Sequence, residues 1–414
     1  MEKQQSKKPL IRFPEFKDAW EHKRLNELLS EAKKRNEDLK YGKDEVLSVS
    51  GELGIVNQIE HLGRSYAGVS VHQYHVVEVG DIVYTKSPLK ANPFGIIKLN
   101  KGKAGIVSTL YAVYKVNQQT AYGPFIDYYF SLDANTNRYL RPLVKKGAKN
   151  DMKINNAYVL HDRIFAPTIP EQTRIASFFT VLDKKIAELK QKKNLLEQYK
   201  KGVMQKLFSQ ELRFNDDNGK EFPKWKNFKI GDIASLIKDG THGTHKDSTI
   251  GNYYLLSAKN VVDGSIKIED SDRKISKEDF DSIYKNYNLK NDDILLTIVG
   301  TIGRTAMWKD NVTNVAFQRS VAFLRFENHL PEFIYQLFNQ EQFQLELLKR
   351  QVVSAQPGIY LGDLAKIKIN IPSIEEQRKI ANFLKTIDDK ITRTNSQLEE
   401  TKRFKKGLLQ NMFI

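Results

Sequence analysis

The sequence predicts an α+β protein of two similar domains and two long helices, which pair as an antiparallel intramolecular coiled coil with pseudo-two-fold symmetry. Three observations support this fold class. The chain repeats itself at an offset of 205 positions. Each copy contains short β-like runs and helical stretches, and then one long charged helix. Both long helices carry an apolar seam, so the repeat indicates two equivalent halves that meet through their helices.

The repeat sets the predicted domain boundaries. Residues 171–208 align with residues 376–413 without a gap, and both copies begin with Glu-Gln and end in KKG-x-x-Q-x-x-F. Trp20 and Trp225 are also 205 positions apart, so each repeat includes an entry segment that precedes the globular part of its domain. We therefore predict a first domain at residues 1–168, a central helix at 169–212, a second domain at 213–373 and a C-terminal helix at 374–414.

The elements follow one order in both halves. In the first half we predict a helix at 21–40, strands at 46–49, 76–79, 81–85, 95–99 and 112–116, helical spacing over 125–143 and a last strand at 163–166. In the second half we predict strands at 253–257, 294–299, 305–308 and 321–326, a helix from 331 to about 350 and a strand at 367–371. Turn residues separate these runs, which is typical of α+β domains with a strand-rich middle.

The long helices have coiled-coil spacing. Alternating steps of three and four meet an apolar residue at seven of nine positions from Phe179 to Leu207, and at six of nine from Leu384 to Met412. About 38 helical residues span roughly 57 Å, too long for burial within one such domain. We expect the helices to pair within the chain, with packing on their own domains or homodimerisation as alternatives.

Glycines and lysines interrupt this pattern. Gly202 and Gly407 mark either a close backbone approach to a partner or ordinary fraying ends. The seam lysines are expected to point their charges into solvent, or alternatively to face DNA; they are Lys193, Lys200 and Lys405.

The composition favours a polyanionic partner. The formal charge is +16 and the pI is near 9.5, and clustered Lys and Arg bind nucleic acid by displacing its counterions. An anionic membrane surface is the rival, but no apolar run reaches the ~18 residues of a membrane span and the start lacks a secretory apolar region. With no cysteine, thiol catalysis and cysteine-ligated zinc are excluded, and we expect a soluble cytoplasmic protein.

Catalytic motifs are incomplete. Asn92-Pro93-Phe94 lacks one proline of the motif with which amino-methyltransferases grip adenine, and no loop for S-adenosylmethionine or nucleoside triphosphate accompanies it. The H-x-x-H pairs at 72–75 and 242–245 lack the glutamate of zinc peptidases. We therefore predict no catalytic, cofactor-binding or metal site in this chain.

Taken together, these residues resemble the specificity subunit of type I restriction-modification enzymes. The resemblance rests on the two Trp segments, the turns at Gly80-Asp81-Ile82-Val83 and Asp293-Ile294-Leu295, the tandem Glu-Gln-x-[Arg/Lys]-Ile-Ala-x-Phe helices and the KKG ends. The first half departs from the family pattern at Thr85-Lys86-Ser87-Pro88, where a Gly-rich turn is usual.

The resemblance implies a DNA-recognition subunit without catalytic activity. Each of two target recognition domains would read one half of a bipartite, asymmetric double-stranded DNA site, while the helices set the spacing. Two modification subunits carrying S-adenosylmethionine would dock on the helices, and restriction subunits using ATP and Mg²⁺ would join them. The alternatives are a non-specific architectural DNA-binding coiled-coil protein and a stand-alone adenine DNA methyltransferase.

Candidate contacts follow from side-chain chemistry and from the matched helix faces. Cations predicted to position phosphates are Lys86, Lys90, Lys145, Lys146, Lys149, Lys238, Lys259, Arg304, Arg319, Lys349 and Arg350. Side chains predicted to reach base edges are Asn150, Asn155, Asn156, His242, Thr244, Asn260, Gln318 and Gln356. Residues predicted to dock other subunits are Lys200, Lys201, Gly202, Phe208, Lys405, Lys406, Gly407 and Phe413.

Overall fold

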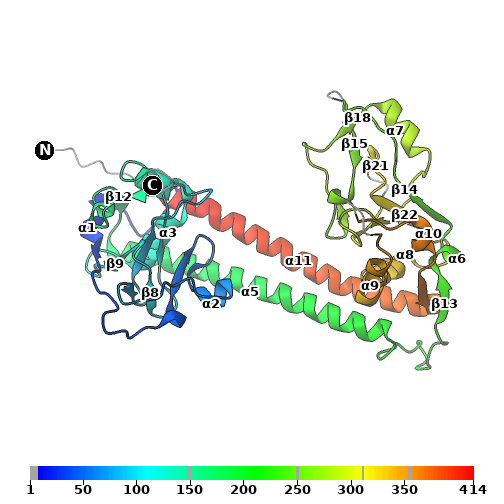
Figure 1. Cartoon of the computed structure of the whole chain (residues 1–414), viewed down its shortest axis with the longest axis horizontal. Helices are drawn as coiled ribbons and strands as arrows, with labels where there is room; N and C mark the ends of the chain where they lie inside the picture. The colour runs from blue at the N-terminus through cyan, green and yellow to red at the C-terminus, as the bar shows by residue number, and fades with distance from the viewer. Residues whose placement is uncertain (1–7, 147–151, 249–250, 310–311, 353–356) are drawn as a thin grey trace. The chain divides into compact units, whose positions relative to one another are not determined.

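The computed structural model describes residues 8–146, 152–248, 251–309, 312–352 and 357–414 (Figure 1). Its internal contacts divide the chain into two compact units, one of residues 1–190 with 396–414 and one of residues 191–395. Two long helices, α5 (Ile169–Phe208) and α11 (Ile374–Met412), each contribute to both units. Each unit therefore contains one domain and a portion of both helices.

The first unit is built around a four-stranded antiparallel sheet in the order β2-β9-β6-β7. Its strands are β1 (Glu21–Arg24), β2 (Leu29–Glu31), β3 (Leu47–Ser50), β4 (Gly54–Asn57), β5 (His75–Val77), β6 (Ile82–Thr85), β7 (Ile96–Leu99), β8 (Gly105–Val107), β9 (Tyr111–Val116), β10 (Lys145–Lys146), β11 (Met152–Lys153) and β12 (Arg163–Ala166). Its short helices are α1 (Leu25–Leu28), η1 (Lys43–Glu45), α2 (Gln58–Leu62), α3 (Gly123–Ser131), α4 (Asp133–Leu140) and η3 (Ala157–Leu160). The other strands form the two-stranded pairs β1-β12, β3-β4, β5-β8 and β10-β11.

The second unit has a four-stranded antiparallel sheet in the order β14-β22-β19-β20. Its strands are β13 (Lys226–Lys229), β14 (Leu236–Asp239), β15 (Tyr253–Leu256), β16 (Val261–Val262), β17 (Ser265–Ile266), β18 (Lys274–Ile275), β19 (Ile294–Thr297), β20 (Thr305–Met307), β21 (Val315–Phe317), β22 (Val321–Arg325) and β23 (Lys368–Ile371). Its short helices are α6 (Ile230–Ile233), η4 (Ala258–Asn260), α7 (Lys277–Tyr284), α8 (Pro331–Phe338), α9 (Glu341–Lys349) and α10 (Leu361–Ala365). Smaller sheets have the orders β18-β15-β21, β13-β23 and β16-β17, and β15 runs parallel to β21.

The two units share a plan, as the repeat predicts. Strands β2, β9, β6 and β7 occupy the same order as β14, β22, β19 and β20, and the pair β1-β12 matches β13-β23. A shared turn precedes β6 and β19. Gly80 and Asp292 both have positive φ, of 90° and 71°, and the following aspartates, Asp81 and Asp293, pair with Lys115 and Arg325.

Each unit buries its own apolar core. In the first unit, the fully buried Trp20 and Phe125 pack with Phe179 of α5 and Phe413 near the end of α11. In the second, Leu207 of α5 and Leu384 of α11 join one cluster with the second domain. Within each unit the late part of one helix therefore packs beside the early part of the other, which confirms antiparallel pairing inside one chain.

The seam was predicted correctly. All nine seam positions of α5 and all nine of α11 are buried or half-buried, and they include the two lysines of α5 and Lys405 of α11. Burial of these positions stabilises both helices, because most helical stability in proteins comes from packing of an apolar face.

Three helical predictions differ from the structure. Residues 21–40 form β1, a single turn α1 and β2, because pairing of Glu21–Arg24 with β12 and of Leu29–Glu31 with β9 overrides the helical spacing of Leu25, Leu28 and Leu29. The stretch 125–143 breaks at Leu132, which has extended backbone angles. The stretch 331–350 breaks where the Gln340 side chain caps α9 by accepting from the Gln342 amide. The main predicted strands of both halves are present, including β6, β9, β19, β22 and β23.

Candidate nucleic-acid interface

The repeated Glu-Gln pair joins each domain to its helix. The Glu171 carboxylate accepts hydrogen bonds from Arg12 Nε at 2.7 Å and Trp20 Nε1 at 3.2 Å. The Glu376 carboxylate likewise accepts from Arg213 Nη2 at 2.7 Å and Trp225 Nε1 at 3.1 Å. These glutamates are buried and their partners come from the segments that lead into the domains, so they have a structural role.

The glutamine after each of these glutamates also connects the helix to its domain. Gln172 Oε1 accepts from the Tyr122 amide at 2.8 Å, and its Nε2 donates to the carbonyls of Thr120 and Pro167. Gln377 repeats this pattern by accepting from the Leu330 amide at 2.9 Å and donating to the Pro372 carbonyl. Both amides are fully satisfied inside the protein, so the motif fixes the angle at which each helix leaves its domain.

The seam lysines form cross-helix pairs, which corrects the expectation that they point into solvent. Lys200 of α5 lies 2.6 Å from the Asp388 carboxylate of α11. Its repeat equivalent, Lys405, pairs with Asp183 of α5, and Lys193 donates to Asn395 at 3.0 Å. Because the aspartates are also 205 positions apart, the two ion pairs are equivalents in the repeat. These charges specify the pairing of the two helices.

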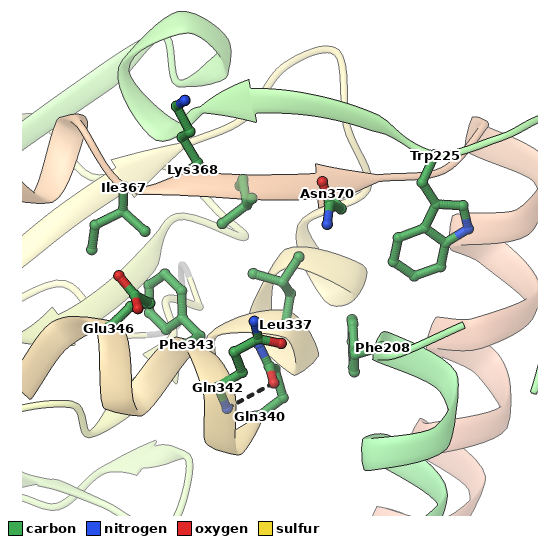
Figure 2. Close-up of a pocket in the computed structure, with 11 residues that line it drawn as sticks. Phe208, Trp225, Leu337, Gln340, Gln342, Phe343, Glu346, Ile367, Lys368 and Asn370 are labelled. Carbon is green, nitrogen blue, oxygen red and sulfur yellow. Dashed lines mark hydrogen bonds between the residues drawn. The ribbon is translucent and has the colours of Figure 1, made fainter. Parts of the chain in front are cut away.

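The predicted docking residues divide into packed and exposed ones. Phe413 is buried against Phe125, with ring centroids 5.2 Å apart. Phe208 lies 5.7 Å from Phe333 and lines a small pocket with Trp225 and Leu337 (Figure 2). Both phenylalanines therefore hold helix ends in place.

The basic KKG ends lie at the surface. Lys201, Gly202 and Lys406 are exposed, and Gly407 is half-buried. A Cβ added at either glycine would meet no described atom within 4 Å. A close approach to the other helix of this chain is therefore not the reason for these glycines, and neither is a fraying end, because both helices continue beyond them.

In the first domain, two predicted contacts come together. Lys145 and Asn155 line an open depression of about 560 Å³ with Tyr158 and His161, whose rings lie 5.0 Å apart. Asn155 Oδ1 accepts from the Ala157 amide, so this oxygen already has a backbone partner. The aromatic pair was not predicted, because neither residue belongs to a motif or a periodic pattern in the sequence.

The other first-domain candidates are more dispersed. Lys86 is half-buried just after β6, whereas Lys90 is exposed in the loop before β7. Lys146 lies on β10, and Asn156 is half-buried at the start of η3. Lys149 and Asn150 lie outside the described residues, as does Gln356 of the second domain.

Most predicted cations of the second domain already have partners within it. These pairs are Lys238 with the Asn286 carbonyl, Lys259 with Asp272, Arg304 with the Val261 carbonyl, and Lys349 and Arg350 with Glu346. Arg319 is exposed, and its guanidinium makes no hydrogen bond or ion pair with another described residue. Exposed ion pairs of lysine are weak, so these lysines could leave their carboxylates and bind phosphate. Arg319 would not have to give up a described partner to bind DNA.

The predicted base-reading residues of the second domain also differ in access. Asn260 is buried, and its amide donates to Asp272 at 2.7 Å and to the Lys267 carbonyl at 3.0 Å. That amide is committed to the fold and is not available to a base. His242 and Thr244 are exposed, and Gln318 is half-buried.

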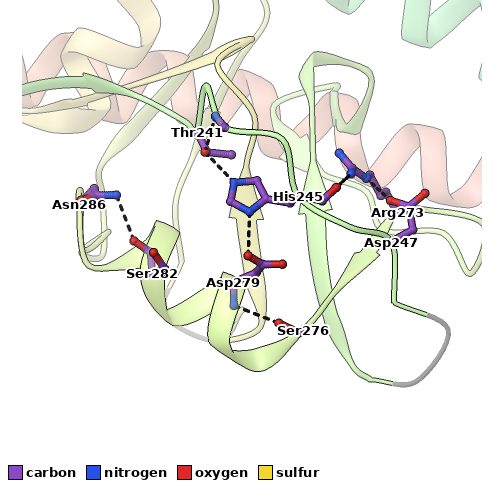
Figure 3. Close-up of polar contacts among 9 residues, drawn as sticks. Thr241, His245, Asp247, Arg273, Ser276, Asp279, Ser282 and Asn286 are labelled. Atoms are coloured by element: carbon purple, nitrogen blue, oxygen red, sulfur yellow. Dashed lines mark hydrogen bonds and ion pairs between the residues drawn. The ribbon is translucent and has the colours of Figure 1, made fainter.

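The loop that carries His242 and Thr244 is anchored at its far end. His245 Nε2 lies 2.9 Å from the Thr241 hydroxyl, and its Nδ1 lies 2.9 Å from the Asp279 carboxylate (Figure 3). Arg273 then contacts the His245 carbonyl and Asp247. His245 therefore has a structural role, because it holds the loop in place. The other histidine of the H-x-x-H pair, His242, is exposed, and its Nε2 lies 2.7 Å from the Asp239 carboxylate.

Neither histidine pair forms a ligand set for a metal. Among the described residues, no group of three or more His, Asp or Glu is placed to hold an ion. His75 is buried in β5, where burial first, and then the charges of Arg35 and Lys86, lower its pKa to about 4. No helix in the described part of the chain combines the length and apolarity needed to cross a membrane.

Comparison with known proteins shows which family this sequence resembles. Residues 223–403 match the family model of the type I restriction modification DNA specificity domain. The family resemblance therefore holds for the second domain and its helix. The matched range covers most of the second domain and most of α11, including the Glu376 joint and the Lys200 partner Asp388.

Curated relatives agree with this similarity. The chain is 28% identical over 258 residues to the type I restriction enzyme MjaVIII specificity subunit of Methanocaldococcus jannaschii, covering 60% of each protein. It is 26% identical over 287 residues to the type I restriction enzyme EcoBI specificity subunit of Escherichia coli, covering 64% of this chain and 58% of that one. The matched regions thus span about 60% of these relatives' lengths.

Solved structures share the fold. The crystal structure of the S subunit of a type I restriction-modification system from M. genitalium superposes with a TM-score of 0.59 at 14% identity, covering 99% of both chains. A structure described for complex assembly and conformational transition of a type I R-M system superposes with a TM-score of 0.54 at 17% identity, covering 95% of this chain and 97% of that one. These likenesses support the two-domain, two-helix architecture.

Proposed function

We propose that this protein is the sequence-specific DNA-recognition subunit of a type I restriction-modification complex. The observation that carries the proposal is the match of the second domain to a DNA specificity domain, together with the same sheet order in the first unit. Two domains of one scaffold with different surface loops suit two different half-sites. A net charge of +16 supplies the non-specific attraction to DNA.

The same proposal assigns catalysis to other subunits. Two modification subunits would bind S-adenosylmethionine and methylate adenine, and restriction subunits would use ATP and Mg²⁺. This chain would hold none of these cofactors. Its part is to place the DNA and to join the subunits, for which the exposed basic ends of the helices offer equivalent surfaces in the two units.

Selection from a random DNA library by the purified chain tests the recognition role. We expect enrichment of two short specified segments separated by a spacer of unspecified sequence. Recovery that shows no preference over scrambled competitor, at any salt concentration, would instead support an architectural DNA-binding protein. Methyl transfer by the chain alone would support a stand-alone methyltransferase.

Charge reversal at the KKG ends tests docking. We expect the double variant Lys201→Glu/Lys406→Glu to co-purify with fewer modification subunits while its urea-unfolding midpoint stays close to that of the wild type. Both side chains are exposed, and the ion pair of Lys201 with Glu341 lies at the surface, where such pairs contribute little stability. Lys200 and Lys405 are poor probes, since a reversed charge there would face Asp388 or Asp183. Lys192→Glu, on the exposed surface of α5, is the matched control. Unchanged stoichiometry in the double variant would contradict docking at these ends.

A further inference from the structure

The second domain has an open cleft of about 780 Å³ that the proposed function does not by itself explain. It lies at the sheet edge where β14 and β19 end and β22 begins. Several separate segments line it, including Asp239 at the end of β14 and His242 after it, Ile298 after β19, Arg319 in the turn before β22, and Tyr360 before α10. Residues far apart in the sequence therefore face one concave surface.

Backbone hydrogen bonds fix these walls relative to one another. The Arg319 amide donates to the Thr241 carbonyl at 3.0 Å, and the Ile298 amide donates to the Ser320 carbonyl at 2.9 Å. The Ile359 amide in turn donates to the Ile298 carbonyl at 2.9 Å. At Gly240 a Cβ would lie 2.1 Å from the Phe317 carbonyl oxygen, so glycine permits this close approach. The cleft is therefore formed before any ligand binds.

The cleft contains apolar side chains and charged side chains of both signs. Ile298 and Ile359 are buried at its floor, while Tyr360 is 66% exposed. Arg319 brings a guanidinium without a described partner, and Asp239 brings a carboxylate that His242 holds at 2.7 Å. The carboxylate disfavours a phosphate, which would meet like charge. A cation beside an acceptor instead matches the major-groove edge of a G·C pair, where guanine offers two acceptors and cytosine a donor.

We propose that this cleft reads a G·C base pair, with Arg319 donating to guanine O6 and N7 and the Asp239 carboxylate accepting from the cytosine amino group. The inference rests on the proposed function, in which this domain reads one half-site. Tyr360 would pack beside the neighbouring base, and His245 would keep Asp239 and His242 in position. The second half-site should then contain one G·C pair that depends on Arg319.

Library selection with the full chain and with Arg319→Ala tests this assignment. We expect the variant to lose a preference of roughly tenfold or more for G·C at one position of one half-site, and to keep the rest of the site. Asp239→Asn should relax the same position. Lys277→Ala, which removes an exposed cation paired with Asp281 in the same domain, is the matched control and should leave the selected sequence unchanged.

The possible failures are distinguishable. A wild-type chain that selects no sequence refutes the proposed function. If the wild type selects a bipartite site but Arg319→Ala selects the same one, the cleft assignment alone is overturned. It is also overturned if Arg319→Ala weakens binding equally for every sequence and lowers the salt dependence, because that is the behaviour of a phosphate contact.

Discussion

Replacing Glu376 by alanine is expected to destabilise the second unit by about 3 kcal/mol, because it removes one partner of a buried ion pair. The Glu376 side chain is fully buried, and the alanine would remove the carboxylate from the Arg213 guanidinium, which would keep only the backbone carbonyls of Phe222 and Pro223. It would also leave the Trp225 indole N–H without its acceptor. Since Arg213 keeps 23% of its side-chain surface exposed, water can partly replace the lost contact, which places the effect at the low end for such pairs. Urea unfolding followed by tryptophan fluorescence and circular dichroism measures the loss.

The neighbouring residue provides the control. Glu375 is exposed in the first turn of the same helix, so Glu375→Ala removes an equal charge without breaking a buried contact and should cost well under 1 kcal/mol. Glu171→Ala should reproduce the Glu376 effect in the first unit, because it contacts Arg12 and Trp20 in the same way. Equal stabilities for Glu375→Ala and Glu376→Ala would contradict the structural role of the joint.

The scaffold was largely predictable because the repeat doubles the information in the chain. Spacing alone identified both helix seams. Helix length predicted that the helices pair, and the antiparallel direction followed because each helix comes directly after its own domain. The seam lysines were misplaced because their partners, Asp183 and Asp388, lie on the opposite helix, and a single helix pattern does not show cross-helix pairs. The helix predicted at 21–40 failed because strand pairing with residues distant in the sequence, in β12 and β9, decides its conformation.

The candidate site was less predictable, because residue type indicates which side chains could bind DNA but not which are free to do so. Asn260 and Arg319 are both plausible DNA contacts in the sequence. In the structure the Asn260 amide is buried and donates to Asp272, whereas Arg319 is exposed. Tyr360 and Tyr158 were missed because single aromatic residues in loops carry no periodic signal. Their positions beside Arg319 and Lys145 depend on tertiary contacts.

The first unit is expected to lose stability as the pH falls from 6.5 to 5, by roughly 2 kcal/mol through His75 alone. Burial lowers the pKa of His75 to about 4 in the folded protein, whereas an unfolded histidine titrates near 6.5. Between these values the unfolded chain binds a proton that the folded chain rejects, so acid favours unfolding. Well above pH 6.5 both states are neutral at this residue and its contribution no longer changes with pH.

The variant His75→Gln isolates this effect from other groups. Its unfolding free energy, measured by urea titration at several pH values, should fall less between pH 6.5 and 5 than that of the wild type, even if its stability at pH 7 is lower. Burial also lowers the pKa of His329 in the second unit, so the wild type retains some acid sensitivity from that residue, and the comparison rests on the difference in slope. His61→Gln, at an exposed position of α2, should keep the wild-type slope. Parallel pH profiles for His75→Gln and the wild type would show that His75 can be protonated without cost, and that the β5 region opens to water more readily than its burial indicates.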